Sequence, residues 1–134
     1  MLFSFDVTVP ANTLSDSPVE EAARLVTGDV TRIGILFRDG PAWLVHAVVE
    51  DQLHRLVPAN PDGTINEDGG IAWSILKYPL TGNPPQLIMK AWSPGTRYQH
   101  ILTFYFDVEP AGGDTWESML LRLFSSQVSS SEEF

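Results

Sequence analysis

Hydrophobic and polar residues alternate along most of the first 110 residues, with the period of two that is typical of a β-strand buried on one face. The first such segment, residues 2–9, ends at Pro10 and places four apolar side chains on one face: Phe3, Phe5, Val7 and Val9. The same criterion predicts further strands at residues 29–37, 43–49, 53–57, 71–80, 87–92 and 98–108.

Two of these segments carry more detail. In residues 29–37 the face formed by Ile33, Ile35 and Phe37 is predicted to be buried, and the opposite face carries Val30, Arg32, Gly34 and Leu36. Nearly every residue of 98–108 is apolar, aromatic or β-branched, and such residues occupy both faces. That composition is typical of a central strand or of one covered by a partner.

Turn residues separate the strands. Ten glycines and ten prolines are spread along the chain, and short strands divided by such turns favour a two-sheet sandwich or a barrel. We predict an all-β fold, an antiparallel β-sandwich of about seven strands, with a jelly-roll-like arrangement as one option. The order of the strands does not follow from the pattern.

Residues 18–27 allow two interpretations. Ser17, Pro18 and Glu20 resemble a helix-capping sequence with proline at the first helical position, and Gly28 could end such a helix. Residues 25–27, Leu-Val-Thr, have the composition of a strand instead. A short helix and an extended edge segment both remain open.

The C-terminal part differs from the rest. After the Ala-Gly-Gly sequence at 111–113, apolar residues recur at the spacing of one helical face. The predicted organisation is a sandwich over 1–110, a hinge and amphipathic helix over 111–126, and a disordered serine-rich tail over 127–134. The helix is too short to be stable alone, so it is expected to dock on its own sandwich or on a neighbouring subunit. The candidate interface residues are Trp116, Met119, Leu120, Leu123 and Phe124.

Charge narrows the set of partners. The chain has 17 acidic and 8 basic residues, a formal net charge of -9, and its basic residues stand apart from one another. Binding to nucleic acid or to an anionic membrane surface needs clustered Lys and Arg, so neither partner is expected. The absence of cysteine excludes disulfides and thiolate ligands. The N-terminal residues lack the basic start of a signal peptide, so synthesis without export is expected.

No motif for catalysis or for a cofactor is present. His46, His54 and His100 have no second histidine at metal-binding spacing, and nucleophile and phosphate-loop motifs are missing. The polar loop 60–68 offers oxygen ligands but lacks the order of a calcium loop, which favours ordinary turns and leaves a surface calcium ion as a side possibility. We expect neither an enzyme nor a cofactor.

Four tryptophans are unusual in a chain of this size. Trp43, Trp73 and Trp92 lie in predicted strands whose neighbours alternate, which favours a place in the core between the sheets. The alternative is an exposed aromatic platform that stacks on carbohydrate.

Several stretches resemble small structural proteins encoded among the virion genes of tailed bacteriophages. They are Val-Thr-Arg-Ile at 30–33, Gly-Pro-Ala-Trp-Leu-Val-His at 40–46, Pro-Ala-Asn-Pro-Asp-Gly at 58–63 and the segment 91–100. The resemblance implies a β-sandwich subunit that is used many times in a capsid or tail. It would associate with itself and dock on other virion proteins, within particles assembled in the bacterial cytoplasm. The alternative function is a carbohydrate- or ligand-binding β-sandwich module.

Overall fold

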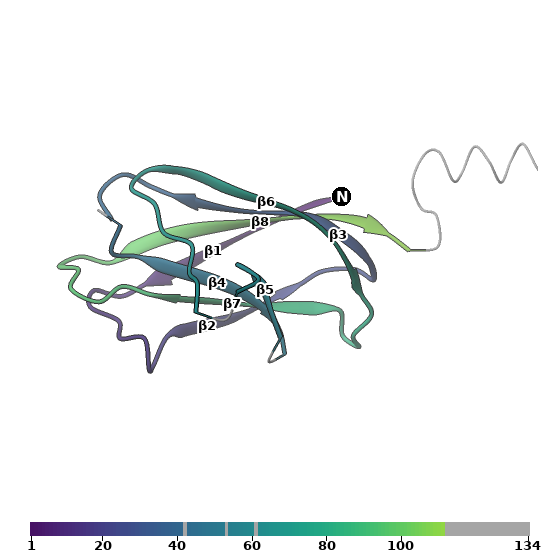
Figure 1. The fold of residues 1–134 in the computed structure, drawn as a ribbon, viewed down its shortest axis with the longest axis horizontal. Helices are drawn as coiled ribbons and strands as arrows, with labels where there is room; N and C mark the ends of the chain where they lie inside the picture. The colour runs from purple at the N-terminus through teal and green to yellow at the C-terminus, as the bar shows by residue number, and fades with distance from the viewer. Residues whose placement is uncertain (42, 53, 61, 112–134) are drawn as a thin grey trace, which may run out of the picture.

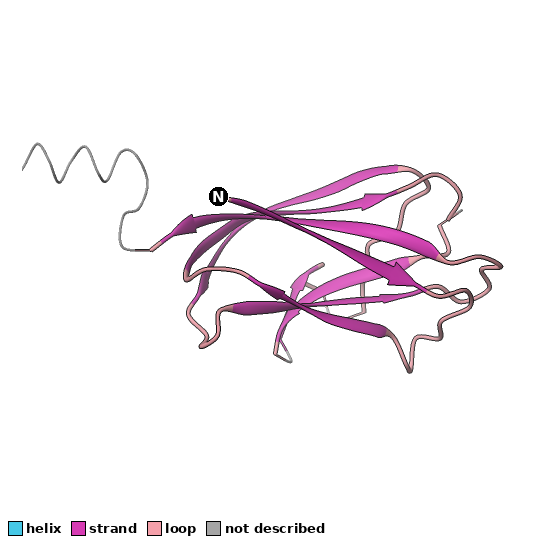
Figure 2. Ribbon diagram, turned by 180° about the vertical axis from the view of Figure 1, so that it is seen from behind, coloured by secondary structure: helices cyan, strands magenta, loops and turns pink. Residues whose placement is uncertain are grey.

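The fold is a sandwich of two antiparallel four-stranded sheets (Figures 1 and 2). The computed structural model describes residues 1–111 except 42, 53 and 61. The predicted C-terminal helix, with its interface residues Trp116, Met119, Leu120, Leu123 and Phe124, and the predicted tail lie outside the described residues. The strands are β1 (Leu2–Val9), β2 (Val19–Arg24), β3 (Gly28–Phe37), β4 (His46–Asp51), β5 (His54–Val57), β6 (Gly70–Leu80), β7 (Gln86–Trp92) and β8 (His100–Pro110).

The strand order is that of a jelly roll. The first sheet has the order β1-β8-β3-β6 and the second the order β2-β7-β4-β5. Apart from the β4–β5 hairpin, each strand is followed by a strand of the other sheet, the winding of the eight-stranded double-sheet jelly roll. The predicted antiparallel sandwich is therefore confirmed, and the option of a jelly roll with it.

The additional strand is β2, which comes from the ambiguous segment. Its six residues pair with β7 along their whole length, and Ala23 is fully buried against the core. Lys90 on β7 forms an ion pair with Glu20 across this pairing, with Nζ 3.2 Å from Oε1. The extended interpretation is correct, because cross-strand pairing and core burial outweigh a local capping pattern.

The core lies between the sheets. Ile33, Ile35 and Phe37 are buried as predicted, and strand β8 contributes Phe104 and Phe106, both fully buried. Strand β8 lies between β1 and β3, so its prediction as a central strand is confirmed. The alternation failed at Val30, which is fully buried rather than on the outer face. A β-bulge between Val30 and Arg32 reverses the phase of the strand there.

The open side between β6 and β5 is closed by a tyrosine. The hydroxyl of Tyr78 donates a hydrogen bond of 2.6 Å to Asp51 on β4, and its ring stacks on His54 of β5. The hydrogen bond to a carboxylate raises the pKa of Tyr78 to about 12, because loss of the phenolic proton would place two negative charges together. This contact ties the edge strand β6 to the second sheet.

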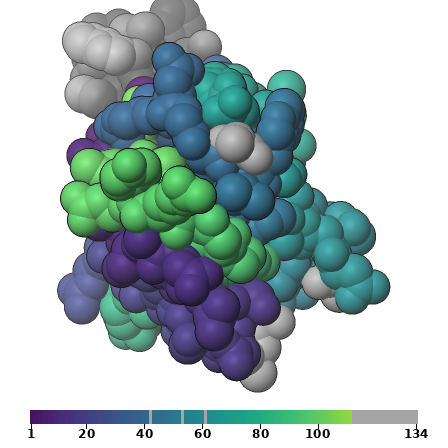
Figure 3. Space-filling view, turned by 90° about the vertical axis from the view of Figure 1, so that its left-hand side faces the viewer, coloured from purple at the N-terminus to yellow at the C-terminus, as the bar shows by residue number. Residues whose placement is uncertain are grey.

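Four loops meet at one end of the sandwich, the end that faces the viewer in Figure 3: residues 10–18, 38–45, 58–69 and 93–99. The first and last of these loops are joined by hydrogen bonds, as are the second and third. The amide of Asn12 donates to Thr96 Oγ1 (2.9 Å), and the Ser93 hydroxyl donates to the Pro10 carbonyl (2.8 Å). The first and last loops therefore form one unit. Within the described part of the chain, no helix has the length and apolar content needed to cross a membrane.

Candidate interaction surface

An aromatic side chain lies across the outer face of the first sheet. Trp73 on β6, Gly34 on β3 and Tyr105 on β8 occupy adjacent positions in one cross-strand row. The Trp73 ring covers Gly34 so closely that a Cβ atom added there would lie 2.5 Å from ring atom Cζ3. The ring centroid lies 5.9 Å from that of Tyr105 and 4.9 Å from Cζ of Arg32. Gly34 is thus the residue that permits Trp73 to lie flat on the sheet.

Replacing Gly34 by Ala is expected to expel the Trp73 ring from this position. The loss of its packing and of the cation–π contact with Arg32 should lower the free energy of unfolding by about 1 kcal/mol. Chemical denaturation measures the change, with Trp73→Ala as the matched background. In that background Gly34→Ala should cost nothing or stabilise the fold, and equal costs in both backgrounds would contradict the assignment.

Strand β6 presents an apolar stripe to solvent. Ile71, Trp73 and Ile75 lie on its outer face, and Ile75, in the middle of the strand, is 86% exposed. We call these three residues the β6 patch. Strand β6 is the last strand of its sheet, and among the described residues no strand pairs with its outer edge. A free, long, apolar edge strand is a template for pairing with another chain.

Features that normally block such pairing occupy only one end of β6. Lys77 and Pro79 follow the patch, and both residue types discourage edge-to-edge association. The preceding segment, 70–76, contains no charged residue and no proline. This contrast within the strand is the sequence signal for the patch, and alternation alone does not reveal it.

The other half of the same sheet face is polar and internally bonded. Arg32 forms an ion pair with Asp107 (3.2 Å), and Arg38 donates to the hydroxyl of Thr103 (3.1 Å). That hydroxyl in turn donates to Asp6 (2.6 Å). These groups satisfy one another, and the exposed apolar side chains beside them, Leu2 and Ile101, lie at opposite ends of the β1–β8 pair. Among the described residues of this face, the continuous apolar stripe is therefore the one on β6.

The prediction that Trp43, Trp73 and Trp92 lie in the core between the sheets is wrong for all three. Trp43 is 56% exposed and lies in a loop, with φ at 66°, and Trp73 is 45% exposed. Trp92 is half-buried, but it lies on the outer face of the second sheet, as Lys90 does, and stacks on His46 at 5.9 Å. Alternation shows that a strand has two different faces, but it does not show which face meets the other sheet.

The second sheet carries a charged cluster on its outer face. Glu50 is only 7% exposed and lies 3.0 Å from Nζ of Lys90 and 3.6 Å from Arg55. The hydrogen bond to Glu50, supported by Glu20, raises the pKa of Lys90 above its ordinary value. Since the carboxylate of Glu50 is paired with two cations, the cluster stabilises the pairing of β7, β4 and β5. That carboxylate is therefore engaged in structural ion pairs and does not have the setting of a catalytic base.

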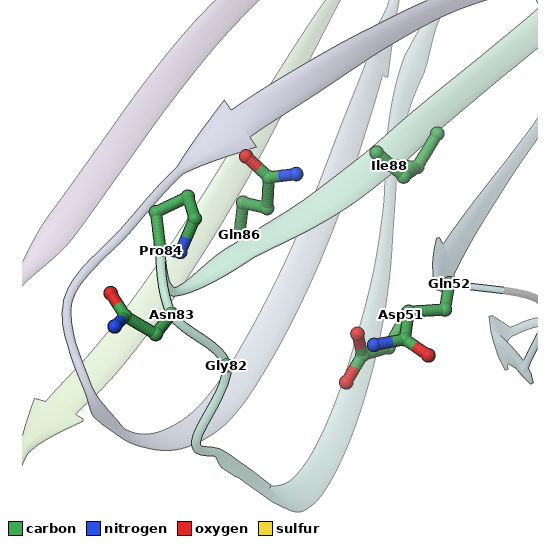
Figure 4. Close-up of a pocket in the computed structure, with 7 residues that line it drawn as sticks. All are labelled: Asp51, Gln52, Gly82, Asn83, Pro84, Gln86 and Ile88. Atoms are coloured by element: carbon green, nitrogen blue, oxygen red, sulfur yellow. The ribbon is translucent and has the colours of Figure 1, made fainter.

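A shallow hollow of about 280 Å³ adjoins this cluster (Figure 4). Figure 4 shows Asp51 and Gln52 on one side and Asn83, Pro84 and Gln86 on the other. A second hollow of about 360 Å³ shares Gln52 and Ile88 with it. Amide and carboxylate groups are among the residues that line both hollows. No histidine lines either hollow.

The three histidines occupy three different strands, β4, β5 and the start of β8. The imidazole of His46 is 2.9 Å from the hydroxyl of Thr64, and burial lowers its pKa. In the part of the chain that the structure describes, no group of three or more His, Asp or Glu side chains has the arrangement of a metal site. The described residues of loop 60–68 form no such group either.

Comparison with known proteins identifies no family. No family model matches the chain, and no curated protein does. Solved structures that match include the Yersinia pseudotuberculosis-derived mitogen (10% identity, TM-score 0.44, 86% of this chain and 92% of that one). FlhE matches at 10% identity and a TM-score of 0.38, over 81% and 97% of the chains. The coat protein of Tobacco streak virus matches at 9% identity and a TM-score of 0.31, over 81% and 88%. Similarities this low do not bear on function.

Proposed function

We propose that this jelly-roll domain is a non-enzymatic structural protein that assembles through the β6 patch. The observation that carries the proposal is the exposure of Ile75, 86%, in the middle of an apolar edge strand of eleven residues. Leaving such side chains in water forgoes about 1.5–3 kcal/mol each. An exposed apolar stripe beside an unpaired strand edge is therefore expected to be covered in the working state of the protein.

Self-association is the direct consequence to test. We expect the chain to form oligomers, and the double variant Trp73→Ser/Ile75→Ser to associate at least tenfold more weakly, about 1.4 kcal/mol. Sedimentation velocity over a range of concentrations measures both. Tyr98→Ser is the matched control, because Tyr98 is 76% exposed but lies at the loop end. Monomers at every concentration, or equal weakening by the control, would contradict the proposal.

The particular assembly that we propose is a virion of a tailed phage, with the domain as a capsid decoration or a head or tail component. Support comes from the resemblance of residues 30–33, 40–46, 58–63 and 91–100 to small virion proteins. In a particle the domain would also dock on other virion proteins. The neighbouring genes test this placement: capsid and tail genes on both sides are expected, whereas a neighbourhood of metabolic genes would contradict it.

A carbohydrate-binding module is the second candidate, and one observation favours it. Tyr98 borders a hollow of about 260 Å³ at the loop end, together with Leu44, Arg97 and His100. An exposed aromatic ring beside polar groups is the usual arrangement for stacking on a sugar. A glycan array probed with the full chain and with Tyr98→Ala tests this function. The full chain should bind glycans and the variant should not, whereas no binding by the full chain would contradict the function.

A further inference from the structure

We infer that the β6 patch binds a second copy of this chain, strand to strand and antiparallel, with Trp73 of one copy opposite Trp73 of the other. The inference rests on the proposed self-association and specifies its geometry. A two-fold axis through the centre of β6 would join the two first sheets into one sheet of eight strands. The argument for this partner comes from the order of side chains along β6.

Two-fold symmetry restricts the possible registers. In an antiparallel pair of identical strands, if one residue lies opposite another, the reverse pair also forms. Opposite residues lie on the same side of the sheet, so a shift by one residue would place the outer face of one copy beside the sandwich face of the other. Three registers near the patch avoid this, with Ala72, Trp73 or Ser74 opposite itself.

Only the Trp73 register pairs all the apolar residues with one another. It places Ile71 opposite Ile75 twice, on either side of the Trp73 pair, so six apolar side chains form one ladder. The Ala72 register leaves each Ile75 opposite Gly69, and the Ser74 register leaves each Ile71 opposite Lys77. The Trp73 register therefore places the largest number of apolar side chains opposite apolar partners.

Charge favours the same arrangement. Lys77 of one copy would lie opposite Gly69 of the other, beside Asp68 and Glu67. The basic end of each β6 thus meets the acidic end of its partner, which adds attraction to apolar contact.

The inner side of the strand also accommodates the pairing. Ala72 would lie opposite Ser74, and Leu76 opposite Gly70, so no two large side chains meet. A closed two-fold contact pairs the β6 edges of both copies with each other. The loop ends and the β1 edges then remain exposed for contacts with other neighbours.

Disulfide formation between copies tests the register, because the chain has no cysteine of its own. In the Trp73 register, cysteines at 72 and 74 face each other at a Cα separation of about 4.5–5.5 Å, within disulfide range. Cysteines at the same position are diagonal neighbours at about 7–8 Å, which is too far. We therefore expect Ala72→Cys/Ser74→Cys to form a reducible dimer on mild oxidation, and each single variant to form at least tenfold less.

The other outcomes overturn the inference in distinguishable ways. A dimer from Ala72→Cys alone, or from Ser74→Cys alone, would show one of the other two registers. Ser17→Cys, in an exposed loop, is the control for background cross-linking. If the cysteine variants of β6 cross-link no more than this control while sedimentation still shows an oligomer, self-association uses another surface. A monomer in sedimentation would remove the proposed self-association as well.

Discussion

Replacing Phe104 by Ala is expected to lower the free energy of unfolding by about 3–5 kcal/mol. Phe104 is fully buried on the central strand β8, with Phe5 opposite it on β1 and Ile35 opposite it on β3. Truncation removes a large apolar side chain and leaves a cavity that the two sheets can fill only in part. Because small domains are stable by about 5–15 kcal/mol, the loss is a large share of the total.

Urea denaturation measures this change, with the slope of the transition as a check that the unfolded surface is unaltered. Ile101→Ala, on the same strand and 37% exposed, is the control and should cost about 1 kcal/mol or less. A loss below about 1 kcal/mol for Phe104→Ala would contradict tight packing between the sheets at this position.

Replacing Glu50 by Gln should cost about 2–3 kcal/mol at neutral pH. The change removes the charge that pairs with Lys90 and Arg55 and leaves two cations close together. Breaking a fully buried pair costs about 3–5 kcal/mol, and the lower figure here reflects that Lys90 and Arg55 reach solvent in part. Glu20→Gln is the matched control. Glu20 pairs with the same Lys90, but its side chain is 53% exposed, so the loss of its charge should cost about 1 kcal/mol or less.

The pH dependence of stability tests the same cluster. The pKa of Lys90 is raised in the fold, so its contribution is fully present below its unfolded pKa of 10.5 and is lost as the pH rises through the folded value. The difference in stability between the natural chain and Glu50→Gln should therefore shrink above pH 10.5. Tyr78, whose pKa is also raised, titrates in both proteins and cancels in the comparison. A difference that stays constant up to pH 12 would contradict coupling between Glu50 and Lys90.

On the outer faces of the sandwich, the polar clusters and the β6 patch have different roles. On the second sheet, Glu50 and its cations hold strands together, and on the first sheet the polar network around Asp6, Thr103 and Arg38 does the same. The β6 patch is different, because Ile75 contributes little to the fold while 86% of it faces solvent. A residue of this kind is the best target for separating assembly from folding, since its replacement should alter the first and spare the second.

Much of the fold was predictable because a β-strand produces a pattern in the sequence that is visible over a few residues. Alternation at Phe3, Phe5, Val7 and Val9 reflects the period of the backbone, and residues 98–108, apolar on both faces, identify a central strand without knowledge of its neighbours. Turn residues at 38–41 and 93–96 mark where the predicted strands 29–37 and 87–92 end. These features depend on residues a few positions apart, so the sequence by itself determined the all-β character of the protein and favoured a sandwich.

The tertiary structure decided what depends on residues far apart in the chain. It set the strand order, drew residues 19–24 into a strand on β7, and turned Val30 inward through a bulge. It also placed Ile71, Trp73 and Ile75 on the outside, although their alternation equally fitted a buried face. Periodicity distinguishes the two faces of a strand but not their surroundings. Which face is covered is decided by the sheet that packs against it, and whether an edge stays free is decided by the strands that pair beside it.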